Sequence, residues 1–202
     1  MNDDLHYDAR MTFGNFYDQK FENLSSGNMS LEKGEYESCS FAGCDFSSAD
    51  LSECRFMDTT FTECDFSNAR LIDTSFQDVV FISCKMQGLF FPDCNSFGFD
   101  VTYQKCLLNY SVFQQMKLKR IQIMDSQLQS ADFSGADLSE AVICCCDLKD
   151  ATFEQTNLEK ADLRGSRNYV IHPEVNRLKG ARFSLPEVVG LLSRYGIKVD
   201  VG

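Results

Sequence analysis

The stretch FAGCD-FSSAD-LSECR-FMDTT-FTECD-FSNAR-LIDTS-FQDVV, residues 41–80, repeats a large residue, almost always apolar, at every fifth position. The period extends in both directions, with Ser26 as its one vacancy before a break at Pro92–Asp100. Before the break, the large residues are Phe16, Phe21, Leu31, Tyr36, Phe41, Phe46, Leu51, Phe56, Phe61, Phe66, Leu71, Phe76, Phe81, Met86 and Phe91. After a shift of two residues, they are Tyr103, Leu108, Phe113, Leu118, Ile123, Leu128, Phe133, Leu138, Ile143, Leu148, Phe153, Leu158 and Leu163, with a brief return at Leu178 and Phe183.

A period of five residues fits neither a straight helix nor a straight strand. Five residues of an α-helix advance about 140° beyond a full turn, so that an apolar stripe would wander around the surface. In a strand, residues five apart point to opposite faces. The period is kept if the backbone bends once every five residues and returns each large residue to a common axis. We therefore predict a solenoid whose coils stack through backbone hydrogen bonds.

A second, smaller residue lies two positions before each large one. It is mostly Ala, Ser, Thr or Cys, which would let a coil close tightly, and Met116 and Ile121 are bulkier exceptions. Because free cysteine packs as a small hydrophobic residue, we interpret most of the cysteines as core residues. Seven of the ten occupy this position, namely Cys39, Cys44, Cys54, Cys64, Cys84, Cys106 and Cys146, and Cys94 extends the phase. Cys144 and Cys145 are expected to point outward.

The repeat resembles that of the pentapeptide-repeat family, whose consensus is A(D/N)LXX. Residues 49–53 (ADLSE), 136–140 (ADLSE) and 161–165 (ADLRG) follow it, and the resemblance covers about residues 11–165. It implies an all-β fold, a right-handed quadrilateral β-helix with four pentapeptides per coil. We expect residues 1–183 to form this β-helix in two stacks, about 11–91 and 101–165, with a loop or bulge near 92–100. Residues 184–202 are expected to form a short C-terminal α-helical cap and tail.

The prediction of the cap rests on Ser184–Val201. Ser184 is a good N-cap, and Gly196 is suited to end a helix. Ile197, Val199 and Val201 alternate like a short strand. The longer segment Asn168–Val201 resembles the C-terminus of Qnr-type pentapeptide-repeat proteins, with His172 in place of the expected Asp, and that resemblance implies a homodimer joined tail to tail. We expect the contact to involve Leu185, Val188, Val189, Leu191, Leu192, Tyr195 and Ile197; the alternative is a cap folded onto its own rod.

The net charge of −11 is concentrated in one part of the chain. Residues 31–100 contain 13 acidic and 4 basic side chains, a net charge of −9, whereas residues 101–202 contain 12 acidic and 13 basic side chains, a net charge of +1. So acidic a block repels nucleic acid and attracts a basic partner. An acidic surface also keeps a protein soluble, which is the simpler interpretation of charge alone.

At four repeats per coil, acidic side chains of residues 45–93 would stack in columns. Glu53, Asp73 and Asp93 would form one column, and Asp58 and Asp78 a second. Like charges about 5 Å apart cost about 0.8 kcal/mol per pair in water, whereas the later column Arg120–Glu140–Lys160 alternates in sign. We therefore predict an acidic track that binds a partner, the alternative being an ordinary acidic surface. The track consists of Asp45, Glu53, Asp58, Glu63, Asp65, Asp73, Asp78 and Asp93.

The residue pattern indicates no catalytic centre. The only histidines are His6 and His172, and the sequence has no C-x-x-C pair and no phosphate-binding glycine motif. We therefore expect no enzymatic activity, no cofactor and no metal site. The N-terminus is polar and acidic, unlike a signal peptide, and no apolar run approaches about 18 residues. A cytoplasmic protein without a membrane segment is expected.

The Qnr-type resemblance implies a function as well as a fold. Such proteins are acidic rods that mimic DNA, bind bacterial DNA gyrase or topoisomerase IV, and protect it from quinolones or related poisons. In Qnr proteins a projecting loop helps to engage gyrase, and here only the break near 92–100 could serve. The alternative is a scaffold or adaptor that binds another cytoplasmic protein. The residues do not distinguish between the two topoisomerases.

Overall fold

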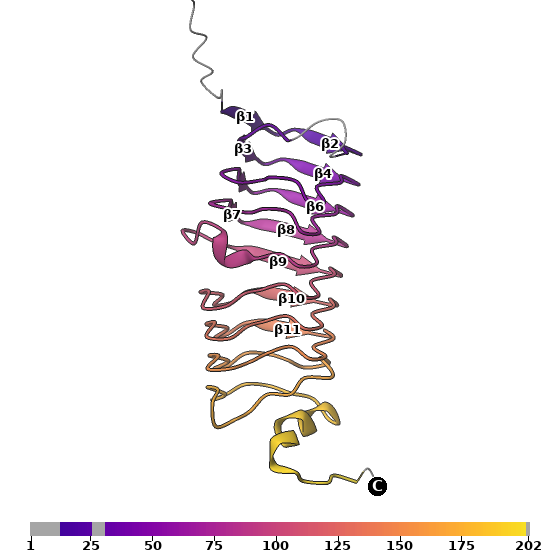
Figure 1. Cartoon of the computed structure of the whole chain (residues 1–202), viewed down its shortest axis with the longest axis vertical. Helices are drawn as coiled ribbons and strands as arrows, with labels where there is room; N and C mark the ends of the chain where they lie inside the picture. The colour runs from indigo at the N-terminus through magenta and orange to yellow at the C-terminus, as the bar shows by residue number, and fades with distance from the viewer. Residues whose placement is uncertain (1–12, 26–30, 201–202) are drawn as a thin grey trace, which may run out of the picture.

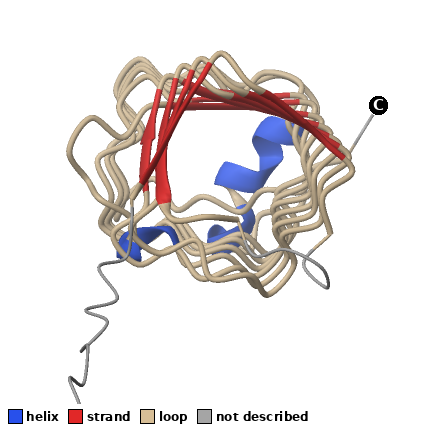
Figure 2. Cartoon of the chain, turned by 90° about the horizontal axis from the view of Figure 1, so that it is seen from above, coloured by secondary structure: helices blue, strands red, loops and turns tan. Residues whose placement is uncertain are grey.

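In a computed structural model, which describes residues 13–25 and 31–200, the chain forms a rod of stacked coils (Figure 1). Seen along the rod axis, the coils superimpose on a roughly four-sided outline, with strands along two of its sides (Figure 2). The predicted all-β quadrilateral β-helix is therefore confirmed. Three features of the sequence analysis fall outside the described residues: the start of the predicted first stack at residues 11–12, the vacancy at Ser26, and Val201.

Short strands in the described residues form two parallel sheets. The smaller sheet contains β1 (Gly14–Tyr17), β3 (Gly34–Glu37), β5 (Arg55–Met57) and β7 (Ser75–Gln77). The larger contains β2 (Lys20–Glu22), β4 (Ser40–Ala42), β6 (Thr60–Thr62), β8 (Val79–Ile82), β9 (Val101–Gln104), β10 (Gln122–Met124) and β11 (Val142–Cys144). Phe41 pairs with Phe61, which gives a coil of 20 residues. Phe81 pairs with Tyr103, 22 residues later, which confirms the predicted shift of two.

Each coil has four faces, which we name by their large inward residues. Face A contains Phe41, Phe61 and Phe81; face B contains Phe46, Phe66 and Met86; face C contains Leu51, Leu71 and Phe91; and face D contains Tyr36, Phe56 and Phe76. The chain follows them in the order D, A, B, C, so that face B lies opposite face D. The seven-stranded sheet is face A and the four-stranded sheet is face D.

The large inward residues stack on one another along the rod and form its core. The rings of Phe41, Phe61 and Phe81 lie nearly parallel, with centroids 4.8 and 5.1 Å apart. The smaller inward residues do more than fill space. Thr74 Oγ1 donates a hydrogen bond to the Leu51 carbonyl of the preceding coil at 2.9 Å, and many Ser, Thr and Cys residues at this position donate in the same way. The thiol of Cys84, for example, lies 3.4 Å from the Phe61 carbonyl.

The bend that the period of five requires lies two residues after nearly every large residue, an exception being Asp93, which ends the 3₁₀ turn η1 (Phe91–Asp93). The backbone is left-handed there, with φ values of 61° at Gly43, 48° at Asp58 and 56° at Asn68. Gly, Asn and Asp adopt this conformation more readily than other residues. The corner position therefore has a conformational preference that the pattern of large residues does not reveal.

The break is a bulge of two extra residues on face D. The Asn95 N–H bonds to the Thr74 carbonyl at 2.9 Å, so the coil keeps its usual register up to this point. Ser96 then occupies the inward phase but is exposed. Phe99 takes its place against the core, with its ring 6.3 Å from that of Phe76. β7 is consequently the last strand of the face D sheet, whereas face A continues without interruption from β8 to β9.

The C-terminal cap is helical, but its turns are 3₁₀ rather than the predicted α. They are η2 (Glu187–Leu191) and η3 (Ser193–Tyr195), and Gly196 ends the second with a left-handed φ of 64°. Segments this short do not nucleate an α-helix by themselves. Ser184 is not the N-cap either, because its hydroxyl accepts a hydrogen bond from the Gly165 N–H at 3.1 Å instead. Ile197 and Val199 form no strand. None of the helices in the described ranges could span a membrane.

The stacked core predicts a sharp contrast between two phenylalanines. Phe61 is fully buried, so Phe61→Ala should lower the free energy of unfolding by about 3–5 kcal/mol. Phe97 is 82% exposed on the bulge, and Phe97→Ala should change it by less than about 0.5 kcal/mol. Urea unfolding followed by circular dichroism measures both, and equal effects would contradict the assignment of the inward positions.

Candidate protein-binding face

Five of the predicted track residues border a single face of the rod. Glu53, Asp73 and Asp93 lie at the corner between faces C and D, and Asp58 and Asp78 lie at the corner between faces D and A. The Asp73 N–H bonds to the Asp93 carbonyl at 2.8 Å, which places these residues on adjacent coils. Two rows of carboxylates thus run along the edges of face D, and we call these five residues the face D columns.

The other three predicted residues lie elsewhere on the rod. Asp45 and Asp65 are bridge partners on face B, opposite face D, and Glu63 lies at the corner between faces A and B. A partner that docks flat on face D does not reach face B. The structure therefore does not bring all eight residues together into one surface.

Asp45 and Asp65 each stabilise the turn that follows them in the sequence. The Asp45 carboxylate accepts a hydrogen bond from the Ser47 N–H, and Asp65 does the same with Ser67, both at 2.9 Å. Hydrogen bonds from the Ser47 side chain and backbone hold the pKa of Asp45 below its usual value. At Asp65, partial burial raises the pKa, but hydrogen bonds from Ser67 and Lys85 outweigh it and leave the pKa lowered. The Asp of the repeat is thus explained by the turn that follows it.

The corner conformation explains only part of the face D columns. Asp58, Asp73 and Asp78 have φ values of 48–53°, in the region that Asp tolerates well. Glu53 also has a positive φ, 67°, although Glu gains no such advantage there. Backbone geometry thus accounts for a short polar residue at Asp58, Asp73 and Asp78. It accounts neither for Glu53 nor for Asp93, which ends the 3₁₀ turn Phe91–Asp93 without a positive φ, and it does not explain why all five residues are acidic.

Basic residues neutralise the columns only at their N-terminal end. Lys33 Nζ lies 3.1 Å from Glu53, and Arg55 pairs with Glu35 on face D itself at 2.6 Å. Within the described residues, no ion pair involves Asp58, Asp73, Asp78 or Asp93. Beyond the bulge the face changes character, because Glu140 pairs there with both Lys119 and Arg120. Face D is therefore acidic before the bulge and mixed after it.

Face A is uncharged over most of its length. Between β4 and β11 its outward positions are Ser40, Ala42, Thr60, Thr62, Val80, Ile82, Thr102, Gln104, Gln122, Met124, Val142 and Cys144. Most of these side chains are half-buried among their neighbours. This neutral sheet adjoins the acidic face D along one edge of the rod.

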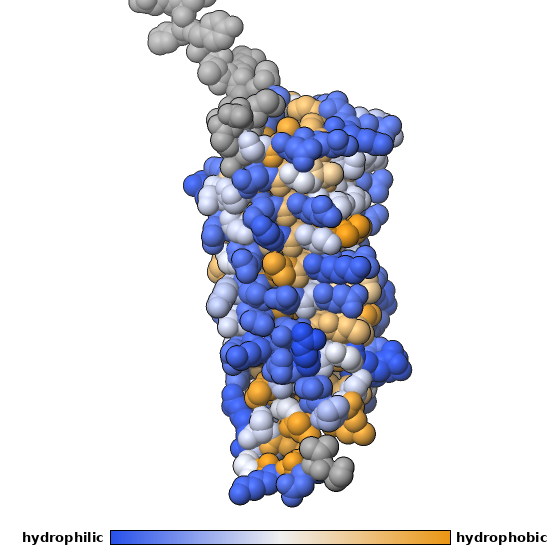
Figure 3. Space-filling model, turned by 90° about the vertical axis from the view of Figure 1, so that its right-hand side faces the viewer, coloured by the Kyte–Doolittle hydropathy of each residue, from blue (hydrophilic) through white to orange (hydrophobic). Residues whose placement is uncertain are grey.

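The predicted dimer residues divide into an inner and an outer set. Leu191 packs against the core of the rod, and Val188 is half-buried. The outer set is Leu185, Val189, Leu192, Tyr195 and Ile197, all exposed. Figure 3 shows apolar surface gathered at this end of the rod. The cap therefore both closes its own rod and presents an apolar outer surface.

The cap is anchored to the rod by polar contacts and by one glycine. Arg194 pairs with Glu154 at 2.7 Å, and the Asn168 N–H bonds to Glu187 at 3.2 Å. Gly190 lies against the Tyr169 carbonyl, where a β-carbon would come within 2.0 Å of that oxygen. Any larger residue at Gly190 would push the cap away.

The cysteines are all free thiols in this structure. Burial raises the pKa of Cys54 and of Cys146, the latter to about 12, which keeps both thiols protonated and unreactive. Cys145 is exposed and Cys144 half-buried, as the sequence predicts for outward positions. No group of three or more His, Cys, Asp or Glu in the described residues is arranged to hold a metal ion.

Comparisons with known proteins find the same repeat and the same fold. Residues 34–98 match a family described as pentapeptide repeat region, and residues 146–167 match pentapeptide repeats (8 copies). A trypsin-treated form of QnrB1, a plasmid-mediated fluoroquinolone resistance protein, is 22% identical, with a TM-score of 0.55 over 92% of this chain and 97% of that chain. HetL, a pentapeptide-repeat protein involved in heterocyst differentiation in the cyanobacterium Nostoc, is 20% identical over 86% and 90% of the two chains, with a TM-score of 0.41. No curated protein sequence matches significantly.

Asp45 accepts a hydrogen bond within a turn, whereas Asp73 belongs to a column of like charges, so we expect mutations of the two residues to have opposite effects on stability. Asp45→Ala removes a hydrogen-bond acceptor from a turn and should destabilise the fold by about 0.5–1 kcal/mol at pH 7. Because the pKa of Asp45 is lowered on folding, its contribution is complete above the unfolded value of about 3.9 and fades as the pH falls through the folded value. Asp73→Asn keeps a residue suited to the corner and removes a repulsion, so it should stabilise slightly at low salt.

Urea midpoints of the two variants at pH 7 and pH 2.5, with and without added salt, measure these effects. A stabilising Asp45→Ala, or a destabilising Asp73→Asn, would contradict the assignment.

Proposed function

The chain is a pentapeptide-repeat protein with the fold of QnrB1, and we propose that it is a non-enzymatic DNA mimic that protects a bacterial type II topoisomerase. The partner would be DNA gyrase or topoisomerase IV, in the cytoplasm, and the protection would be against quinolones or related poisons. The observation that carries this proposal is the pair of carboxylate rows along face D.

The face D columns resemble a short piece of a nucleic-acid backbone in their charge. Successive coils are about 4.8 Å apart, so two columns place about one charge per 2.4 Å of rod. Double-stranded DNA places about one per 1.7 Å of axis. An enzyme that binds DNA offers a basic groove, and a rigid row of carboxylates is complementary to it. The columns extend over three coils, so they act as a local contact rather than along the whole rod.

The apolar outer surface of the cap supports a homodimer joined end to end. Leu185 is 84% exposed and Ile197 is 55% exposed, which is unusual for large apolar residues that have no partner. A second copy would cover both and would double the length of the rod. Such a dimer would present two sets of face D columns to its partner.

A second candidate is an adaptor that joins other proteins, and face A favours it. Its outward positions from Ser40 to Cys144 are all uncharged, which is unlike DNA and suits a flat protein partner. Under this alternative the acidic columns serve only solubility. The two candidates therefore place the partner on different faces.

Protection from ciprofloxacin tests the proposal directly. In a gyrase supercoiling assay the protein should restore activity at a drug concentration that otherwise inhibits it. The variant Glu53→Gln/Asp73→Asn/Asp93→Asn should lose most of that effect, because it removes one column without changing the corner backbone.

The matched control is Asp45→Asn/Asp65→Asn on the opposite face, which should protect as well as the unchanged protein. If the protein neither protects gyrase nor binds gyrase or topoisomerase IV, the proposal is wrong and the alternative function as an adaptor is favoured. Equal loss in both variants would point to net charge rather than face D.

The dimer has its own test. Leu185→Glu/Leu192→Glu places charge on the outer surface of the cap, and sedimentation should show a monomer where the unchanged protein is a dimer. Leu191, which packs against the core of the rod, and the half-buried Val188 are left intact so that the cap still closes the rod. An unchanged protein that sediments as a monomer at about 100 μM would rule out a dimer of useful affinity.

A further inference from the structure

The bulge opens a gap in the backbone hydrogen-bond ladder of face D. One coil further along, the Asp137 N–H bonds to the Met116 carbonyl at 2.9 Å, as is usual between coils. In the part of the chain that the structure describes, no backbone bond joins residues 94–98 to residues 116–119. The two coils are neighbours in the rod, yet their facing edges are not paired here.

Six backbone groups lose their partners at this gap. The N–H groups of Ser96, Gly98 and Lys117 and the carbonyls of Cys94, Lys117 and Lys119 make no hydrogen bond within the described residues. Unpaired groups of this kind are typical of the edge of a sheet, where another strand can add. The extended part of this edge ends before the turn at Phe97 and Gly98, where Gly98 has a left-handed φ of 68°. Here the edge lies in the middle of the rod rather than at its end.

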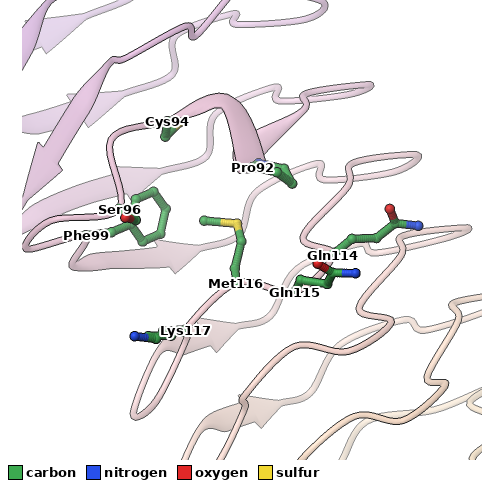
Figure 4. A pocket seen from close by; sticks show the side chains of 8 residues that line it. All are labelled: Pro92, Cys94, Ser96, Phe99, Gln114, Gln115, Met116 and Lys117. Carbon is green, nitrogen blue, oxygen red and sulfur yellow. The ribbon is translucent and has the colours of Figure 1, made fainter.

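A groove follows the gap, and its lining combines four apolar residues with four polar ones. It encloses about 380 Å³, within the range of ligand-binding sites. Figure 4 shows Met116 pointing into the space between Phe99 and Pro92, with Cys94 on the far wall. A smaller hollow beside Phe99 and Lys119 continues it along the coil. The groove therefore offers apolar contacts beside a row of unpaired backbone groups.

Lys117 is the one charged side chain that lines the groove itself, and Asp100 and Lys119 both line the smaller hollow beside it. Among the described residues Lys117 forms no ion pair, whereas the nearby Lys119 pairs with Glu140. Its neighbours Gln114 and Gln115 are neutral. A bound molecule with an acidic group beside Lys117 would supply the missing partner.

We propose that this groove binds an extended segment of a partner protein as an added β-strand, with an apolar side chain on Met116 and Phe99 and an acidic side chain on Lys117. A peptide strand supplies both donors and acceptors for the unpaired groups, as in other cases of strand addition. A small molecule could fill the cavity but would leave most of these groups unpaired. The groove adjoins Asp93 of the face D columns, which lies between Pro92 and Cys94, but the site does not depend on the identity of the main partner.

Amide hydrogen exchange tests the gap itself. The Lys117 amide should exchange at least about tenfold faster than the amides of Asp137 and Asn157, which occupy the same position on the next two coils and are bonded. Equal protection of the three amides would show a closed ladder and overturn the proposal.

Binding is tested on the full chain with a fluorescein-labelled seven-residue peptide of alternating valine and glutamate. Fluorescence polarisation should show saturable binding, and the NMR signal of the Met116 methyl group should shift. A peptide with alternate backbone nitrogens methylated, and one with lysine in place of glutamate, should each bind about tenfold more weakly. Lys117→Glu should weaken binding of the acidic peptide by a similar factor.

The matched control is Lys160→Glu, an exposed lysine on the corner of the same face two coils away, which should leave binding unchanged. Circular dichroism confirms that each variant is folded. No binding at about 1 mM peptide, or equal binding of the methylated peptide, would overturn the proposal. Because the assay contains no topoisomerase, its outcome does not depend on the proposed function.

Discussion

The backbone hydrogen bonds between successive coils are the constraint on which the rest of this structure depends. They form where successive coils bend at matching positions, and the coil with two extra residues keeps them on face A but not at its bulge on face D. The bends require a left-handed residue once every five positions, as at Gly43 and Asn68. A large residue two positions before each bend then always faces the axis. With 20 residues per coil, residues 20 apart lie on the same face of adjacent coils, so the position of a residue in the sequence determines the face on which its side chain lies.

Much of the fold could be predicted from the sequence, because the large residues mark the axis directly. The period of five, the inward cysteines and the shift of two residues at the break are all visible without coordinates. The pattern of large residues does not identify the corner positions, although Gly43 and Gly88, each two residues after a large residue, indicate them. The role of Phe99 could not be predicted, since it lies outside the period and replaces Ser96 only through tertiary packing. The 3₁₀ form of the cap depends likewise on contacts with the last coil.

The candidate site was predicted in part. Stacking in columns follows from the coil length, and the same count of four pentapeptides per coil places Asp45 and Asp65 two faces away from the face D columns, so the eight predicted residues do not form one surface. The sequence does not separate an Asp that holds a turn from an Asp that only projects into solvent. The energies are compatible with a functional surface: repulsion of about 0.8 kcal/mol between neighbouring carboxylates is small beside the several kcal/mol that one buried phenylalanine contributes. The stacked core therefore tolerates an acidic face that does not favour folding.

The central functional claim is that partner recognition takes place on face D, and site-specific photo-crosslinking to purified DNA gyrase tests it most directly. A photoreactive amino acid would be placed, one position at a time, at Glu53, Asp73 and Asp78 on the edges of face D and at Asp45, Asp65 and Gln127 on face B. We predict crosslinks from the first three positions and none from the second three. Crosslinks from face B, or from neither face, would contradict the account.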